Sequence, residues 1–255
     1  MVHTDPTLRF SARVENYIRY RPGYPPQVLE TLRTECGLTP QSIIADIACG
    51  TGIFTRMLLD NGNRVYGVEP NREMREAAER LLASYSNFTC AAGAAEATTL
   101  PDRSIDIATA AQAAHWFDLP KARTEFARIL RPKGWAVLLW NERSTDTTPF
   151  LRSYEDLLLA YGTDYEQVRH EHTTDNIADF FTPTAFQSRL FDMRQEFTYP
   201  ELEGRLLSSS YAPMPGHPSY EPMLERLHHM FETYSKNGRV TMEYVTRMYY
   251  GQLIS

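Results

Sequence analysis

Residues 43–69 read IIADIACGTGIFTRMLLDNGNRVYGVE, and this stretch decides the fold. The apolar run at 43–47 is typical of a strand covered on both faces. A loop with two glycines follows at 48–52, then a helical stretch at 54–59 and an Asn-Gly turn at 61–62. A second strand at 64–68 ends at Glu69. Strand, loop, helix and strand in this order predict parallel strands joined by a right-handed crossover.

The alternation of strands and helices continues on both sides of this stretch. Two helices are expected before it, and the chain after it alternates as far as residue 140. Beyond 140 the pattern becomes helical and aromatic, with an alternating strand near 191–199 and a β-rich segment at the end. The expected helical stretches are 10–19, 26–36, 72–83, 119–130, 142–185 and 200–236, the last one broken at 212–218. The expected strands are 88–92, 105–110, 135–140, 191–199 and 240–250.

Composition narrows the class of protein. The chain has 255 residues, 26 Lys and Arg against 32 Asp and Glu, and a formal net charge of -6, so a duplex-binding protein is disfavoured. It has no apolar run long enough to span a membrane, and residues 1–17 lack the pattern of a signal peptide. Three cysteines without a CxxC motif suggest free thiols in a reducing compartment. We therefore expect a cytoplasmic protein, monomer or homodimer, with a small-molecule partner and neither nucleic acid nor membrane.

The loop at 48–52 and Glu69 together indicate a nucleoside-binding site. Glu69 stands seventeen residues beyond Gly52, at a strand end where a carboxylate can accept both ribose hydroxyls. A dinucleotide site would have a third glycine where Thr55 stands, and Asp46 would repel a pyrophosphate. The ammonium end of S-adenosylmethionine suits Asp46 better.

Five motifs in order extend this reading: DIACGTG at 46–52, VEP at 68–70, GAAE at 93–96, AQAAHWFD at 111–118 and RILRPKG at 128–134. Together they resemble the class I S-adenosylmethionine-dependent methyltransferases, and more narrowly the small-molecule branch that includes trans-aconitate methyltransferase and the type 11 group. The resemblance covers residues 10–141 well and the remainder weakly. One departure is Ala48, where the family usually has glycine.

The resemblance implies a Rossmann-like, doubly wound α/β fold. Its seven-stranded sheet would be mostly parallel, with an antiparallel last strand inserted beside the sixth, plus a helical lid. We expect one methyltransferase domain over residues 1–255. Within it, 1–36 would lie over the cofactor, 37–141 would form the cofactor-binding core, 142–236 the lid helices and sixth strand, and 237–255 the last strand.

The resemblance also assigns roles within the cofactor site. The loop residues would surround the amino-acid moiety and ribose edge, Glu69 would bind the ribose hydroxyls, and an arginine before the first proline-rich turn would pair with the methionine carboxylate. Structural roles remain open for these residues: loop bracing for Asp46, a solvated strand end for Glu69 and a solvated helix end for Arg21. The residues assigned to the cofactor are Tyr17, Arg21, Asp46, Ala48, Gly50, Gly52, Glu69, Pro70, Ala95, Glu96 and Ala111.

His115 is the candidate catalytic residue, because it follows the fourth strand beside the expected methyl-transfer position. It could serve as a general base, as a hydrogen-bond donor or as a loop residue. We expect no metal and no covalent intermediate. Cationic side chains that could anchor an anionic acceptor are Arg143, Arg152, Arg169, His170, His172 and His217.

The sequence thus predicts a methyltransferase that acts by direct displacement on a small hydroxyl, carboxylate or amine acceptor. An NAD(P)-dependent oxidoreductase and a non-catalytic S-adenosylmethionine-binding protein remain alternatives.

Overall fold

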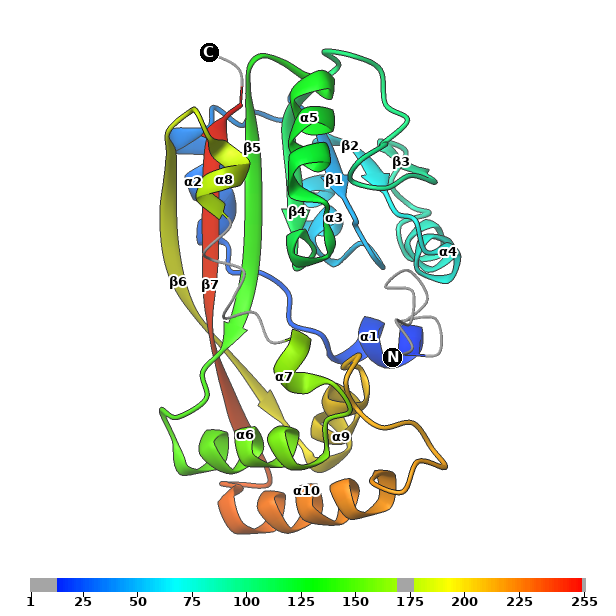
Figure 1. Ribbon diagram of the computed structural model, residues 1–255, viewed down its shortest axis with the longest axis vertical. Helices are drawn as coiled ribbons and strands as arrows, with labels where there is room; N and C mark the ends of the chain where they lie inside the picture. Colours follow the sequence, from blue (N-terminus) through cyan, green and yellow to red (C-terminus); the bar gives the residue numbers. More distant parts are fainter. Residues whose placement is uncertain (1–12, 169–176, 254–255) are drawn as a thin grey trace.

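A computed structural model describes residues 13–168 and 177–253 (Figure 1). A seven-stranded sheet has the order β3-β2-β1-β4-β5-β7-β6. The first five strands in this order run parallel, and β7 is antiparallel to both of its neighbours. The expected seven-stranded fold, with its antiparallel last strand beside the sixth, is confirmed. The strands are β1 (Ile43–Ile47), β2 (Arg64–Val68), β3 (Phe88–Ala91), β4 (Ile105–Ala111), β5 (Leu130–Arg143), β6 (Phe186–Phe197) and β7 (Val240–Gln252).

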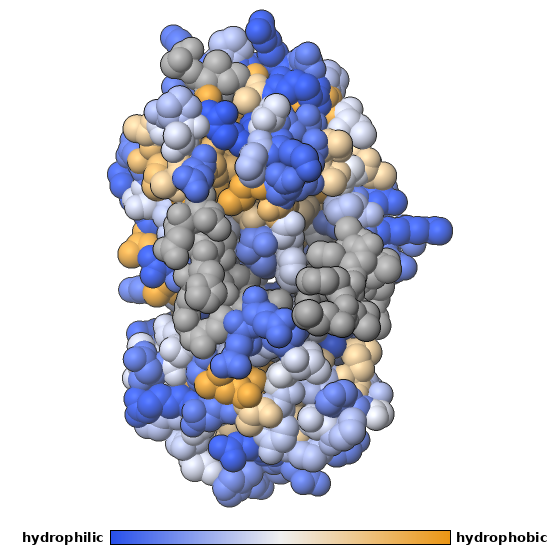
Figure 2. All heavy atoms as spheres, in the orientation of Figure 1, coloured by the Kyte–Doolittle hydropathy of each residue, from blue (hydrophilic) through white to orange (hydrophobic). Residues whose placement is uncertain are grey.

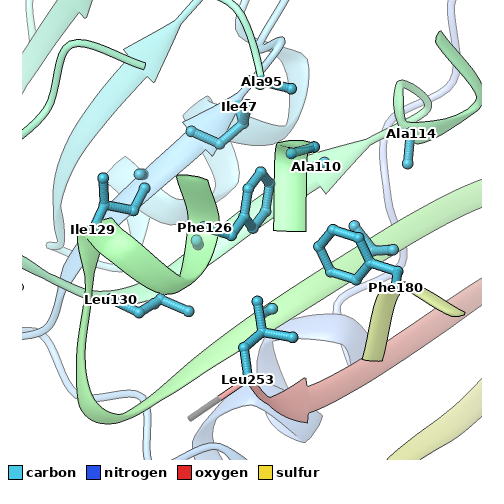
Figure 3. Packing of buried hydrophobic residues seen from close by; sticks show 14 of the residues in the cluster. Ile47, Ala95, Ala110, Ala114, Phe126, Ile129, Leu130, Phe180 and Leu253 are labelled. Carbon is cyan, nitrogen blue, oxygen red and sulfur yellow. The ribbon is translucent and has the colours of Figure 1, made fainter. Parts of the chain in front are cut away.

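Helices cover both faces of the sheet, because successive side chains of each buried strand point to opposite sides. In β1, Ile44 joins a cluster with α2 (Gln27–Glu35) and α3 (Ile53–Asp60). The next residue, Ala45, joins the cluster on the other face, under α5 (Leu119–Ile129) and α8 (Ile177–Phe181). Figure 3 shows Phe126 of α5 and Phe180 of α8 converging there, with ring centroids 5.4 Å apart. The helix α4 (Arg72–Leu81) packs beside β3.

The last three strands of the sheet run well past the ends of the others and carry a second group of helices (Figure 1). These are α6 (Pro149–Tyr161), α9 (Tyr199–Leu207) and α10 (Tyr220–Tyr234). They bury a separate hydrophobic cluster against the lower ends of β6 and β7. We call this group, together with α7 (Tyr165–Val168), the lower helices.

Several predicted boundaries in this region are wrong. The sixth strand begins at Phe186 and not at 191, and α6, α7 and α8 stand within the stretch 142–185 that was expected to be one helical segment. The fifth strand is not limited to 135–140, since it pairs with β7 as far as Arg143 opposite Tyr244. Pairing along a long partner strand overrides the polar composition that suggested a helix from residue 142. Tyr199 is not in the sixth strand but begins α9, because Thr198 and Glu201 form a capping box that starts the helix.

The helix α1 (Val14–Tyr20) lies between the sheet and the lower helices (Figure 1). Arg13 donates hydrogen bonds to the carbonyls of Leu207 (3.0 Å) and Ala212 (2.6 Å). Glu15 forms an ion pair with Arg80 of α4 at 3.1 Å. This helix therefore bridges the two parts of the molecule. Residues 10–12 of the predicted first helix lie outside the described residues.

The face of the molecule in Figure 2 is mostly polar, with apolar residues in small scattered groups. Within the described residues, no helix is both long and apolar enough to cross a membrane.

Candidate cofactor and acceptor site

The loop between β1 and α3 has three residues with left-handed backbone conformations. Ala48, Gly50 and Gly52 have φ angles of +54°, +57° and +85°. Glycine tolerates this region without steric cost, whereas Ala48 adopts it with strain. Gly52 is needed for a further reason, because a Cβ there would lie 2.6 Å from Cδ1 of Leu82. The loop therefore keeps its shape through backbone geometry that side chains would oppose.

Asp46 is the fourth of the five residues of β1 and is 1% exposed. Its two carboxylate oxygens accept hydrogen bonds from Thr55 Oγ1 at 2.6 Å and from Thr109 Oγ1 at 2.9 Å. Burial raises the pKa of Asp46 to about 6, although the two threonine hydrogen bonds oppose that shift. The residue at the third glycine position of a dinucleotide motif, Thr55, thus has a definite role of its own. With a pKa of about 6, the Asp46 carboxyl changes its protonation state just below neutral pH, and a bound cation would favour its ionised form.

Glu69 lies behind the loop and is 6% exposed. It accepts one hydrogen bond from the backbone N–H of Gly50 and one from that of Asn71, both at 2.9 Å. Burial raises the pKa of Glu69, and these two backbone donors lower it again in part. Because a carboxylate has about four acceptor positions, Glu69 keeps capacity for further donors such as hydroxyls. It is a buried bridge between the loop and α4, not a solvated strand end.

Arg21 follows α1, and its guanidinium lies over the Tyr17 ring at 5.0 Å. Nη2 donates to the carbonyl of Ser208 at 3.0 Å, whereas Nε is buried with no hydrogen-bond partner among the described residues. Burial lowers the pKa of Arg21, and the positive charge of Arg205 lowers it further. Arg21 is therefore not a solvated helix end, and its site favours an anion.

A cavity of about 720 Å³ connects the loop with the lower helices. This volume is within the range of sites for cofactors and small ligands. The residues predicted for the cofactor or for catalysis that line it are Tyr17, Arg21, Asp46, Ala48, Gly50, Ala111 and His115.

The other predicted cofactor residues do not line this cavity. Gly52 belongs to the loop itself, and Glu69 accepts a hydrogen bond from the loop backbone at Gly50. Ala95 is buried in the hydrophobic cluster beneath α5, and Pro70 is exposed. Glu96 accepts a hydrogen bond from the backbone N–H of Asp118 at 2.8 Å and so holds the segment after η3 (Ala114–Trp116). Their proposed adenine contacts stay predictions.

His115 lies in η3, at the end of β4, and faces the cavity. Its ring packs against Trp116 with centroids 4.6 Å apart. The position fits any of the three roles considered for it, and the choice between base, donor and loop residue stays open.

The lower wall of the cavity contains residues that sequence reasoning did not select. Arg205, Tyr211 and Tyr244 line it, together with Arg247 and Tyr165. A signal for Arg205 was present in the sequence, because it falls three residues after Leu202 and one before Leu206, both fully buried. A cation within the apolar stripe of a helix is unusual.

Of the predicted anchors for an acceptor, Arg143 reaches the cavity, but it is paired with Glu155. Arg152 and His217 are exposed and do not line the cavity, so the structure does not bring them to the site. Arg152 lies in α6 and His217 in the segment between α9 and α10. Spacing in the sequence did not show whether these side chains would face the cavity. Arg169, His170 and His172 lie outside the described residues.

No group of three or more His, Cys, Asp or Glu side chains in the described part of the chain is arranged to hold a metal ion. The expectation of a metal-free site stays a prediction.

Comparison with known proteins agrees with the fold and the loop. Residues 45–138 match the family described as "Methyltransferase domain". A protein named as an uncharacterized methyltransferase of Mycobacterium tuberculosis is 34% identical over 169 residues, which cover 66% of this chain and 65% of the relative. A methyltransferase-like protein of Schizosaccharomyces pombe, also named as uncharacterized, is 33% identical over 156 residues, covering 61% and 59%. The match therefore spans less than two thirds of the length of these relatives.

A solved structure from Anaeromyxobacter dehalogenans, provisionally described as a type II methyltransferase, shares the fold. Its TM-score is 0.68 at 21% identity, over 92% of this chain and 99% of the other. The matched family and the shared fold thus indicate a methyltransferase domain that includes residues 45–138, and they support S-adenosylmethionine as its cofactor. The narrower resemblance to the small-molecule branch stays a prediction.

Proposed function

We propose that this protein transfers a methyl group from S-adenosylmethionine to a small organic acceptor. The observation that carries the proposal is the continuous cavity between the glycine-containing loop and the lower helices. It has room for an acceptor as well as a nucleoside cofactor.

The charged side chains of the cavity fit the zwitterionic end of this cofactor. Asp46 offers a buried carboxylate to an ammonium group, and Arg21 offers a guanidinium with a buried, unpartnered Nε to a carboxylate. A pyrophosphate would be repelled by Asp46 once that residue is ionised. Glu69, fixed by Gly50 and Asn71, is the proposed acceptor for the ribose hydroxyls.

The bound cofactor supplies a methyl carbon that is already electrophilic, so the protein's part is to position the acceptor and exclude water. We propose that α1 and the lower helices act as the lid for this purpose. Arg205 of α9 and Tyr211, in the segment after α9, line the same cavity as Ala48 and Gly50, together with Tyr244 of β7. His115, on the wall beside the end of β4, is the proposed base or donor for an acceptor that carries a proton. A cytoplasmic location stays a prediction.

A thermal-unfolding panel tests the proposed cofactor. Purified protein is heated with S-adenosylmethionine, S-adenosylhomocysteine, NAD⁺ or NADPH. A ligand at about 100 times its Kd adds about 2.7 kcal/mol, which for this chain length raises Tm by about 5–10 °C. A rise with the two sulfur compounds alone supports the proposal. A rise with a nicotinamide cofactor alone would refute it.

A further inference from the structure

The cavity holds a buried cation that the cofactor does not account for. Arg205 is 6% exposed and projects from α9. Its Nε donates to Tyr244 Oη at 3.3 Å and its Nη1 to Ser209 Oγ at 3.1 Å. The described residues offer no carboxylate within 4.0 Å of this guanidinium.

The other cations of the cavity wall have assigned partners. Arg143 forms an ion pair with Glu155, and Arg247 forms one with Glu142. Arg21 has the proposed cofactor carboxylate. Arg205 is left without a counter-charge among the residues that the structure describes.

The remaining acids of the wall do not compensate Arg205. Asp46 is engaged by two threonine hydroxyls, and Asp146 lies in an exposed part of the chain. Neither acid forms an ion pair with Arg205, so its guanidinium lines the cavity without an adjacent counter-charge among the described residues.

The position of Arg205 is set by close packing of the backbone. A Cβ on the preceding residue, Gly204, would lie 2.0 Å from the Tyr20 ring, so α9 approaches α1 as closely as a glycine allows. Leu202 and Leu206 are fully buried on the same helix. This packing fixes the position of α9, and Arg205 lies on the cavity wall with only 6% of its surface exposed.

A buried, unpaired cation costs folding free energy, and an apolar side chain of similar volume would avoid that cost. A planar guanidinium that has N–H groups without hydrogen-bond partners can bind a carboxylate through two parallel hydrogen bonds. A single unpaired cation balances one negative charge, which matches a carboxylate better than the double charge of a phosphate monoester.

We propose that Arg205 binds a carboxylate group of the methyl acceptor, so that the acceptor is a small organic acid. This inference rests on the proposed methyl transfer. Arg205 acts as a specificity-determining residue that anchors and orients the acid in the lower half of the cavity, with Tyr211 and Tyr244 beside it.

The test uses the full chain saturated with S-adenosylhomocysteine. Binding of matched probes is measured by calorimetry at constant ionic strength: succinate against succinamide, benzoate against benzamide, and phenyl phosphate. The variants are Arg205→Met, which keeps the volume and removes the charge, and Arg205→Lys, which keeps the charge and removes the fork. Arg194→Met is the matched control, because the Arg194 side chain on β6 is 74% exposed, is paired with Glu243 and does not line the cavity.

We expect at least one carboxylate to bind the wild type more tightly than its amide. Arg205→Met should weaken that binding about tenfold or more, the loss of a charge-assisted bidentate contact. Arg205→Lys should weaken it less, and Arg194→Met should leave it unchanged. Affinity for S-adenosylhomocysteine should stay the same in Arg194→Met, and in the Arg205 variants it should change much less than affinity for the acid.

Two results would overturn the inference: no preference of the wild type for either acid over its amide, or tighter binding of phenyl phosphate than of both carboxylates. The comparison of acid with amide needs no variant, so it decides the matter even if Arg205→Met does not fold. If a folded Arg205→Met protein kept its affinity for carboxylates, the inference would also be overturned. The role of Arg205 would then be to connect α9 with β7. Failure of the wild type to bind S-adenosylhomocysteine would instead refute the proposed function.

Discussion

Replacement of Asp46 by asparagine should stabilise the protein without cofactor at neutral pH. Asp46 is 1% exposed, and burial raises its pKa from 3.8 to about 6. A shift of about two units corresponds to about 3 kcal/mol of folding free energy spent on holding the ionised form. Asparagine avoids this cost but accepts less well from Thr55 and Thr109, which removes about 1 kcal/mol of the gain. The net expectation is about 2 kcal/mol, or a rise in Tm of about 4–8 °C.

The sign of the pH dependence follows from the direction of the shift. The folded carboxyl binds its proton more tightly than the unfolded one, so its contribution is fully present below about pH 4. It is lost as the pH rises through about 6. Urea unfolding of both proteins from pH 4.5 to 8 should therefore show a difference that grows with pH.

The same variant should lose affinity for S-adenosylhomocysteine, because the ammonium group loses its charged partner. Asp192→Asn is the control, since Asp192 is an exposed carboxylate of β6 and its removal should leave the pH profile unchanged. The reasoning would be refuted if Asp46→Asn were less stable than the wild type at pH 7.5. It would also fail if the difference between the two proteins were the same at every pH.

Three further outcomes are expected. Gly52→Ala should destabilise the protein by about 2–4 kcal/mol in urea unfolding, because the new Cβ adds a clash with Leu82 to the strain of a positive φ. Gly216→Ala is the control, because Gly216 has a φ of +89° and open space around its Cβ position. This variant should show the backbone strain alone, about 1–2 kcal/mol. Equal losses in the two variants would contradict the packing argument. Glu69→Gln should weaken S-adenosylhomocysteine binding about tenfold or more in calorimetry, by the loss of charge-assisted bonds to the ribose, and unchanged affinity would remove Glu69 from the cofactor site. With an acceptor in hand, His115→Gln should lower kcat about 100-fold and leave cofactor affinity intact if His115 is the base, whereas an unaltered kcat would leave it a structural role.

Much of the fold was predictable from local sequence patterns. The run at 43–47 and the strand at 64–68 match β1 and β2 to the residue, because a strand covered on both faces is mostly apolar and turn residues mark its ends. The loop between them was predictable because left-handed backbone positions favour glycine, and two of its three such positions carry one. Asn71 and Asp118, which cap α4 and α5, also precede helices where the pattern placed them.

The ends of the long strands were not predictable in the same way. β5 extends to Arg143 because β7 pairs with it there, and the partner is about a hundred residues away in the sequence. A local pattern contains no information about such a partner, so the polar residues after Trp140 suggested a helix.

The sequence by itself determined the class of fold and the place of the glycine-containing loop, and it favoured S-adenosylmethionine as the cofactor, since each depends on residues close together in the chain. Only the tertiary structure decided which cations face the acceptor. Arg205 and Arg152 are both helical arginines, yet one is 6% exposed on the cavity wall and the other is exposed to solvent. The difference arises from packing between distant elements: Gly204 lies against Tyr20, and the Arg205 Nε–H donates to Tyr244 on β7. Burial of a charge is a property of what surrounds it, and those surroundings exist only once the chain has folded.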